Sequence, residues 1–267
     1  MIWLPIFLTT VLSFSLPSVG GQLSLTGQTI QGGLIFGWAT PGARILLNNQ
    51  SIPQAKSGDF LLGFSYNARA SAQLVVTFVD GSIEKRSFLI QQRDYDIQRI
   101  DQLPKRKVTP STTELVLIKS ERKLMTKANL RTVKEPFFIE GFTRPILGRI
   151  SGIFGSQRIL NGKRRRPHFG VDIAVPEGSA VKATSSGVVI FTHEGMFFNG
   201  KTVVISHGLG LRSTYIHMST ILVKPNMRVS RGDIIGKVGK TGRATGPHLH
   251  WAIHLNATPL DPELLFR

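Results

Sequence analysis

Histidine is confined to one end of this 267-residue chain, and the spacing of the histidines limits what that end can form. All seven histidines lie from His168 onward. Three short motifs there are His168-Phe-Gly-Val-Asp172, Tyr215-Ile-His217 and Gly246-Pro-His-Leu-His250. They supply four imidazoles and one carboxylate. Because catalytic zinc takes about three nitrogen or oxygen ligands and keeps one open position, this set could hold a metal and leave two histidines for catalysis.

His248 and His250 are two residues apart, which on a β-strand turns both side chains to the same face. Leu249, Trp251 and Ile253 then alternate onto the opposite face, which we expect to be buried. Pro247 is tolerated at the entry to a strand. An isolated His-x-His pair is usually an ordinary surface or core feature. Its occurrence together with the other two motifs favours a metal site.

His168 and Asp172 are four apart, a spacing that would also suit a helix. Pro167, Gly170 and the β-branched Val171 argue against a helix and for an extended or looped segment. A neutral imidazole and a carboxylate both suit Zn²⁺. For His193, His207 and His254 we expect no part in the site.

The formal net charge of +17 first suggests a nucleic-acid partner. However, the basic runs at 105–107, 119–131 and 163–166 carry no recognisable nucleic-acid-binding motif. The charge alone therefore does not establish a nucleic-acid partner, and we expect none. The chain has no cysteine, which excludes disulfides, thiolate metal sites and a thiol nucleophile.

The composition along the chain predicts four segments. Residues 1–20 are apolar and then small, which is typical of a secretory signal peptide, although the start carries no Lys or Arg and an uncleaved anchor is the alternative. After cleavage we expect no stable membrane span. Short strands with turns over 21–92 predict a small immunoglobulin-like β-sandwich. Residues 93–140 read as a basic connector with one helix from about Thr113, capped by Thr112 or Thr113. Its polar stretch 102–110 is expected not to pack.

Residues 141–267 alternate apolar and polar positions between glycine-rich turns, so we expect an almost all-β domain. This domain resembles the lysostaphin-type zinc metallopeptidases, a family of peptidoglycan endopeptidases. The resemblance runs from about Ile146 to Asp261 and keeps order and approximate spacing. It is carried by Gly152-Ile-Phe-Gly155, His168-Phe-Gly-Val-Asp172, Pro176-Glu-Gly178, Val204-Ile-Ser-His-Gly208, Thr214-Tyr-Ile-His217, Gly232-Asp-Ile-Ile-Gly236 and Gly239 to His250.

The resemblance implies a mainly β fold: a metallopeptidase domain of the duplicated-hybrid-motif type, here preceded by the β-sandwich and the helical connector. It also implies one Zn²⁺ per chain, with His168, Asp172 and His250 on the positions of the ligands. His217 and His248 fall on the positions of the two catalytic histidines that do not bind the metal. Which of the two is the base is left open. Tyr215 is a candidate substrate contact or, alternatively, a packing tyrosine.

Three functions follow as hypotheses. The first is an exported, periplasmic or envelope-associated zinc endopeptidase that hydrolyses peptide bonds of peptidoglycan. The second is a non-catalytic or autoinhibited regulator that activates other wall hydrolases, with the connector helix as a plug. The third is a basic nucleic-acid-binding protein, which the export signal disfavours. The sequence leaves open the bond that is cut, either a D-amino-acid cross-link or a glycyl bridge, together with the oligomeric state and the protein partners.

Overall fold

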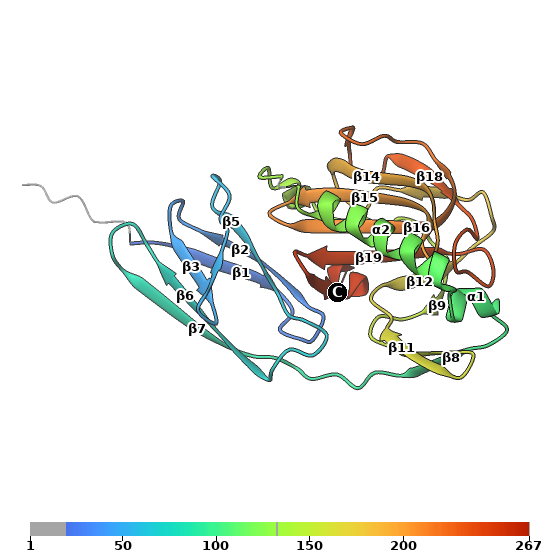
Figure 1. Ribbon diagram of the computed structural model, residues 1–267. Coiled ribbons are helices and arrows are strands. Elements are labelled where there is room, and N and C mark those ends of the chain that lie inside the picture. Colours follow the sequence, from blue (N-terminus) through green and yellow to red (C-terminus); the bar gives the residue numbers. More distant parts are fainter. Residues whose placement is uncertain (1–19, 132, 267) are drawn as a thin grey trace, which may run out of the picture.

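The structure, a computed structural model, describes residues 20–131 and 133–266. It is mainly β, as expected, with a smaller N-terminal and a larger C-terminal β region (Figure 1). The predicted signal peptide lies outside the described residues, apart from Gly20. Within the described part, no helix combines the length and the apolar character that crossing a bilayer requires.

The N-terminal region is a β-sandwich of two antiparallel sheets. Phe60 and Leu62 of one sheet pack against Leu74 and Val76 of the other, and all four are fully buried. The strand order corresponds to an immunoglobulin-like sandwich. In this protein the fourth strand pairs with the third. One sheet contains β1 (Leu23–Gly27), β2 (Leu34–Ala39) and β5 (Asp59–Gly63), and the other β4 (Gln50–Ile52), β3 (Arg44–Leu47), β6 (Ser71–Thr77) and β7 (Ile83–Leu89).

The connector contains more regular structure than the sequence predicts. Its elements are β8 (Ile97–Ile100), α1 (Lys105–Val108), α2 (Thr112–Asn129) and the 3₁₀ helix η1 (Phe137–Glu140). Helix α2 begins with a capping box in which the Ser111 hydroxyl accepts from the Glu114 N–H and the Glu114 carboxylate accepts from the Ser111 N–H. The cap is therefore Ser111, and the prediction of Thr112 or Thr113 was wrong by one or two positions.

The prediction that residues 102–110 do not pack is also wrong. Leu103 and Val108 are buried against Leu160 in a small hydrophobic cluster. Strand β8 pairs in parallel with β10 (Gln157–Leu160), which forms a hairpin with β11 (Lys163–Pro167). The sequence hid this packing because the apolar partner lies more than fifty residues further along the chain.

The C-terminal domain is built on one large sheet, whose main path runs β17-β14-β15-β16-β19-β12-β9. Strands β12, β19 and β16 are neighbours in it, and they carry most of the predicted site residues. The strands are β9 (Arg149–Gly152), β12 (Val171–Ala174), β13 (Ala180–Lys182), β14 (Gly187–Met196), β15 (Gly200–Gly208), β16 (Leu211–Ile221), β17 (Arg228–Val229), β18 (Ile234–Val238), β19 (Leu249–Leu255) and β20 (Thr258–Leu260), followed by the 3₁₀ helix η2 (Pro262–Phe266).

The two β regions share a hydrophobic core. Leu34 and Leu61 of the sandwich belong to the same buried cluster as the core of the large sheet. The Phe36 ring lies 6.1 Å from that of Phe138 in η1. At the polar edge of this contact, Arg93 Nη1 lies 2.8 Å from Asp261 Oδ2. Helix α2 runs across the C-terminal domain (Figure 1), and its buried Glu121 accepts hydrogen bonds from the Phe197 N–H.

Candidate metal and catalytic site

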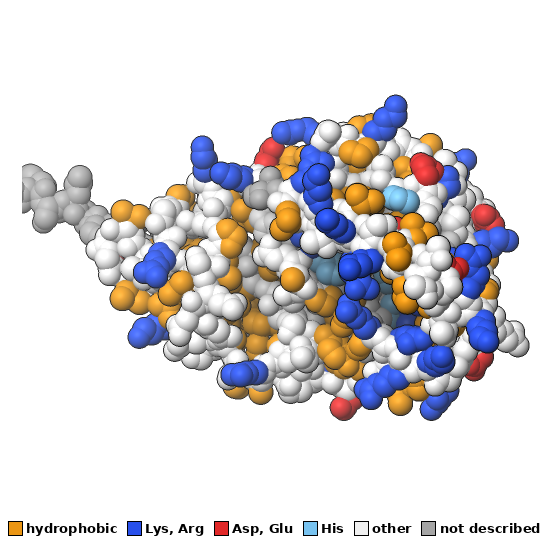
Figure 2. All heavy atoms as spheres, in the orientation of Figure 1, with side chains coloured by type: hydrophobic (Ala, Val, Ile, Leu, Met, Phe, Trp, Pro, Cys, Tyr) orange, Lys and Arg blue, Asp and Glu red, His pale blue; other side chains and the backbone are white. Residues whose placement is uncertain are grey.

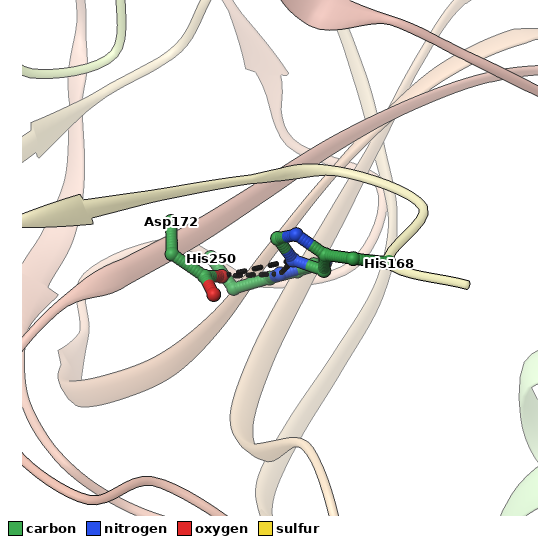
Figure 3. A group of neighbouring side chains, drawn as sticks. All are labelled: His168, Asp172 and His250. Carbon is green, nitrogen blue, oxygen red and sulfur yellow. Dashed lines mark hydrogen bonds and ion pairs between the residues drawn. The ribbon is translucent and has the colours of Figure 1, made fainter. Parts of the chain in front are cut away.

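Two neighbouring strands and one loop bring His168, Asp172 and His250 together (Figure 3). Asp172 on β12 lies directly opposite His250 on β19 in the antiparallel register, so both side chains leave the same face of the sheet. His168 precedes β12 and is held by a hydrogen bond from its N–H to the Ser156 carbonyl. The segment is extended or looped, as Pro167 and Gly170 indicate, and not helical.

The three donor atoms are spaced as a metal centre requires. His168 Nε2 lies 2.8 Å from His250 Nδ1 and 3.1 Å from Asp172 Oδ1, and His250 Nδ1 lies 2.8 Å from the same oxygen. Donors bound tetrahedrally to zinc at about 2.0–2.2 Å would stand roughly 3.3 Å apart. Shifts of about half an ångström would therefore accommodate an ion, and two imidazoles with one carboxylate form a suitable donor set.

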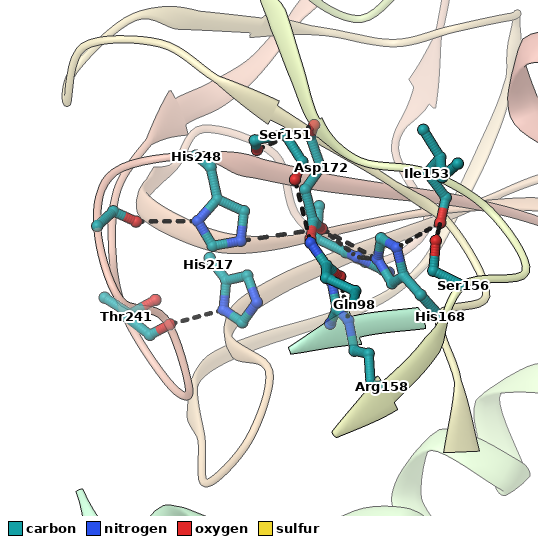
Figure 4. A network of polar contacts seen from close by, with 12 residues as sticks. Gln98, Ser151, Ile153, Ser156, Arg158, His168, Asp172, His217, Thr241 and His248 are labelled. Atoms are coloured by element: carbon teal, nitrogen blue, oxygen red, sulfur yellow. Dashed lines mark hydrogen bonds and ion pairs between the residues drawn. The ribbon is translucent and has the colours of Figure 1, made fainter. Parts of the chain in front are cut away.

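The outer atoms of these side chains are also held. His168 Nδ1 lies 3.1 Å from the Ile153 carbonyl, which can only accept, so this nitrogen carries the proton and Nε2 has the free lone pair. Asp172 Oδ2 is bonded by Arg158 Nη2, and Arg158 Nε donates to Gln98 Oε1 of β8 (Figure 4). Such outer hydrogen bonds orient ligands and fix their tautomers.

The electrostatics of the site favour the metal-binding protonation states. Burial alone would raise the pKa of Asp172, but its close polar contacts with His168 and His250 outweigh burial and lower that pKa well below its ordinary value. Burial lowers the pKa of His250 to about 4, although Asp172 opposes the shift. At neutral pH the carboxylate is therefore charged and the His250 imidazole neutral, as metal ligation requires.

His217 and His248 form a second pair beside the ligand cluster, with ring centroids 4.8 Å apart (Figure 4). His217 Nδ1 lies 2.7 Å from the Thr241 carbonyl and His248 Nδ1 lies 2.9 Å from the Gly246 carbonyl. Both Nδ1 atoms are therefore donors, and both Nε2 atoms carry a free lone pair. His248 Nε2 is 3.9 Å from Asp172 Oδ1. Burial, and then the neighbouring His248 and His250, lower the pKa of His217 to about 3.

The backbone at His217 explains why this side chain reaches the site. Ile216 is opposite His250 in the register, so regular alternation would turn His217 to the other face, together with Tyr215. Instead His217 has a φ of 65°, which is uncommon for a residue other than glycine. Its N–H bonds to the Asn199 carbonyl. This strained conformation lies at the site itself, as such residues often do.

Tyr215 does not reach the site. It is 0% exposed in the core of the sheet, and its hydroxyl accepts from the Thr184 N–H at 2.8 Å and contacts the Ser213 hydroxyl at 3.0 Å. The predicted substrate contact is wrong, and the alternative of a packing tyrosine holds. Tyr215 follows the regular alternation of the strand to the buried face, whereas the positive φ at His217 turns the His217 side chain into the site.

The other three histidines lie apart from the cluster, as the sequence predicts. His207 is 0% exposed, with its two ring nitrogens 2.7 Å from the Ser186 carbonyl and 2.7 Å from the Ser213 hydroxyl. His193 Nδ1 accepts from the Gly195 N–H. Burial lowers the pKa of His254 to about 4, and nearby Arg212 adds to the shift.

Sequence reasoning missed Arg158 and Gln98, which support Asp172. Arg158 lies in an arginine-rich hairpin and Gln98 in a segment that we expected to be a plain connector. No local signal distinguishes them, because their role depends on the parallel pairing of β8 with β10.

Two imidazoles and one carboxylate that could hold a metal ion, with two further histidines beside them, form a candidate metallopeptidase centre on the large sheet. Residues 166–262 match the model of a family described as peptidase family M23. The C-terminal domain therefore belongs to that family, the lysostaphin-type peptidases, which confirms the resemblance drawn from the motifs.

Relatives and solved structures agree with this assignment. The chain is 43% identical over 114 residues to peptidoglycan DD-endopeptidase ShyA of Vibrio cholerae, which covers 42% of this chain and 26% of that protein. It is 38% identical over 115 residues to DD-carboxypeptidase/endopeptidase Mpg of Neisseria meningitidis, which covers 43% of this chain and 26% of that protein. The match therefore spans about a quarter of these relatives. A crystal structure of a putative peptidase M23 from Pseudomonas aeruginosa is similar over 89% of this chain and 95% of that chain, with a TM-score of 0.68 and 28% identity.

Proposed function

We propose that this protein is a zinc-dependent endopeptidase that hydrolyses peptide bonds in bacterial peptidoglycan, with His168, Asp172 and His250 as the ligands of one zinc ion. The observation that carries the proposal is the convergence of five side chains: three donor atoms within hydrogen-bonding distance of one another and two histidines beside them. The names of the relatives, which include peptidoglycan DD-endopeptidases, support the substrate class. Such a substrate places the protein in the cell envelope.

A bound zinc ion would polarise the scissile carbonyl and lower the pKa of a coordinated water. The protein supplies the proton transfers. His217 and His248 each hold Nδ1–H on a backbone carbonyl and present an Nε2 with a free lone pair to the site. Either Nε2 can accept a proton from the attacking water, and the protonated ring can then stabilise the oxyanion or return the proton to the leaving amine. Arg158 keeps the Asp172 carboxylate in place through this sequence.

The direct test measures zinc content and the digestion of purified peptidoglycan sacculi with the same protein preparations. We expect the wild type to carry about one zinc per chain and to release new amino termini. His250→Ala should lose both metal and activity, whereas His217→Ala should keep the metal and lose activity. His193→Ala, a histidine away from the cluster, serves as the matched control. Wild-type protein that binds no zinc would disprove the ligand assignment.

One observation favours the alternative of an autoinhibited wall regulator. Leu115 and Ile118 of α2 line the same cleft as His168 and His250, and Gln98 of β8 contacts Arg158 beside the ligands. The connector therefore forms part of the wall of the site. If zinc-loaded protein leaves sacculi intact but cuts them after proteolytic nicking within residues 101–131, inhibition by the connector is the better account.

A further inference from the structure

Arg243 is a partly buried cation next to the catalytic histidines that forms no ion pair with any described residue. It follows the turn at Thr241, whose carbonyl holds His217. Its guanidinium carbon lies 4.4 Å from the centroid of the Phe198 ring. Among the described residues, the guanidinium donates to the Lys107 carbonyl, at a long distance of 3.5 Å. Burial, and then the neighbouring Arg158 and Arg165, lower its pKa to about 10. It therefore remains a cation at neutral pH.

The two neighbouring arginines add positive charge without supplying a partner. Arg165 Nη2 donates to the Val108 carbonyl at 2.6 Å, but its Nε is buried and has no hydrogen-bond partner among the described residues. Arg158 is occupied by Asp172 and Gln98. Both arginines therefore raise the positive charge around Arg243, and Asp172 is the carboxylate that Arg158 already binds.

Arg158 and Arg243 line two cavities beside the ligand cluster, and Arg165 lines the larger of the two. Arg158, His217 and Arg243 line both a cavity of about 300 Å³, which also touches His248, and a cleft of about 660 Å³, which also touches His168 and His250. Among the described residues, Asp172 is the one acidic residue of the first cavity, and the second has none. Figure 2 shows Lys and Arg side chains gathered around the histidine atoms on this face.

A guanidinium binds a carboxylate through two parallel N–H···O bonds, and such charge-assisted pairs are stronger than neutral hydrogen bonds. Positive charge that merely attracts the cell wall could be placed on any exposed surface. Arg243 instead lies partly buried at two cavities that His217 also lines, without an acidic partner among the described residues, and is therefore placed to bind a carboxylate that enters there.

We infer that Arg243, together with Arg165, forms a subsite for a free carboxylate on the substrate, adjacent to the amide that is hydrolysed. The inference rests on the proposed peptidase function and identifies its substrate class. In a cross-link from a D-amino-acid carbonyl to a diamino dicarboxylic acid, the leaving amine is on a carbon that also bears a free carboxylate. The interior of a glycyl-glycine bridge has no such group. The subsite therefore selects the D-amino-acid cross-link.

The test uses two matched peptides that place a D-Ala carbonyl before the scissile amide and differ only in the next residue, which ends in a free carboxylate or in a carboxamide. We expect the purified zinc-loaded protein to cleave the acid about 10–100 times more efficiently in kcat/KM, the range expected for a hydrogen bond to a charged group. Arg243→Met should remove this preference, so that the kcat/KM ratio of acid to amide falls to about 1, and Arg243→Lys should retain part of the preference. Arg164→Met is the matched control, because it removes an arginine next to Arg165 on the β10–β11 hairpin that does not line either cavity.

Equal cleavage of acid and amide by the wild type would overturn the subsite and leave the peptidase proposal standing. An equal loss of the preference for the acid in Arg164→Met would also overturn the subsite, because the preference would then come from general surface charge. If neither peptide nor any sacculus is cut, the proposed activity fails. Calorimetric binding of the two peptides to wild type and Arg243→Met then decides the subsite alone. Preferential binding of the acid that depends on Arg243 supports it, and binding that Arg243→Met does not alter rejects it.

Discussion

At the scale of single residues, the site depends on atoms that face away from the metal position. His168, His217 and His248 each use Nδ1 to donate to a backbone carbonyl, and this fixes Nε2 as the atom that faces the site. Asp172 uses one oxygen for the ligand cluster and the other for Arg158. The backbone and one arginine therefore select the tautomers and the orientation on which the proposed chemistry depends.

Replacing Arg158 by Met should weaken zinc binding without removing any ligand. Asp172 Oδ2 would lose its charged partner, and loss of such supporting contacts lowers metal affinity by about 10–100-fold. Competition with a chromophoric chelator measures the change. Arg164→Met, on the same hairpin, should bind zinc like the wild type. An unchanged zinc affinity in Arg158→Met would show that the contacts of Asp172 with His168 and His250 are enough to hold its carboxylate.

The stability of the protein should fall in acid partly because of His207. Burial lowers its pKa to about 4 in the folded chain, against about 6.5 when unfolded. Between about pH 6.5 and 4, His207 is therefore protonated in the unfolded state but not in the folded state. The contribution of His207 is present above pH 6.5 and is lost as the pH falls to about 4, by roughly 3 kcal/mol in total.

The measurement is urea unfolding at a series of pH values between 7 and 4. His207→Gln should show a shallower loss of stability across this window than the wild type, whatever its stability at pH 7. His193→Gln should retain the wild-type slope. Parallel slopes in all three proteins would mean that His207 accepts its proton without leaving its buried site.

At the scale of elements, the sequence predicted those features that local patterns determine. The i, i+2 spacing of His248 and His250 predicted a strand, and the buried Leu249, Trp251 and Ile253 confirm its alternation. The remaining features depend on contacts between distant segments. The conformation of His217 follows from its bond to Asn199, and β8 is a strand because it meets β10. Neither contact leaves a periodic signal in the chain.

Helix α2 should depend on one buried carboxylate for its attachment to the domain. Both oxygens of Glu121 lie 2.9 Å from the Phe197 backbone nitrogen, and Glu121 is 6% exposed. Glu121→Ala leaves that N–H without its acceptor, so we expect a cost of about 1–3 kcal/mol and faster amide exchange in α2. Lys123→Ala, an exposed position on the same helix, controls for helix propensity. Uniform exchange rates in α2 across both variants and the wild type would assign the attachment to apolar contacts alone.

At the scale of the whole molecule, the β-sandwich and the C-terminal domain are joined by a common hydrophobic core as well as by the connector. Leu34 and Leu61 of the sandwich are buried within the cluster that extends through the large sheet. The Arg93–Asp261 ion pair adds a polar contact at the same junction. A shared core of this kind transmits the loss of packing in one part to the other. We therefore expect a single cooperative unfolding transition for the described chain.

Leu61→Ala tests this coupling. Leu61 is 3% exposed and packs at the junction, so truncation should cost about 2–5 kcal/mol through lost burial and the cavity that it leaves. Hydrogen exchange followed by mass spectrometry along a urea series reports on β6 of the sandwich and β15 of the large sheet separately. If the core is shared, both strands lose protection at the same urea concentration, and Leu61→Ala shifts both midpoints equally. A shift confined to β6 would mean that the sandwich unfolds on its own, and the metal site would then be stable without it.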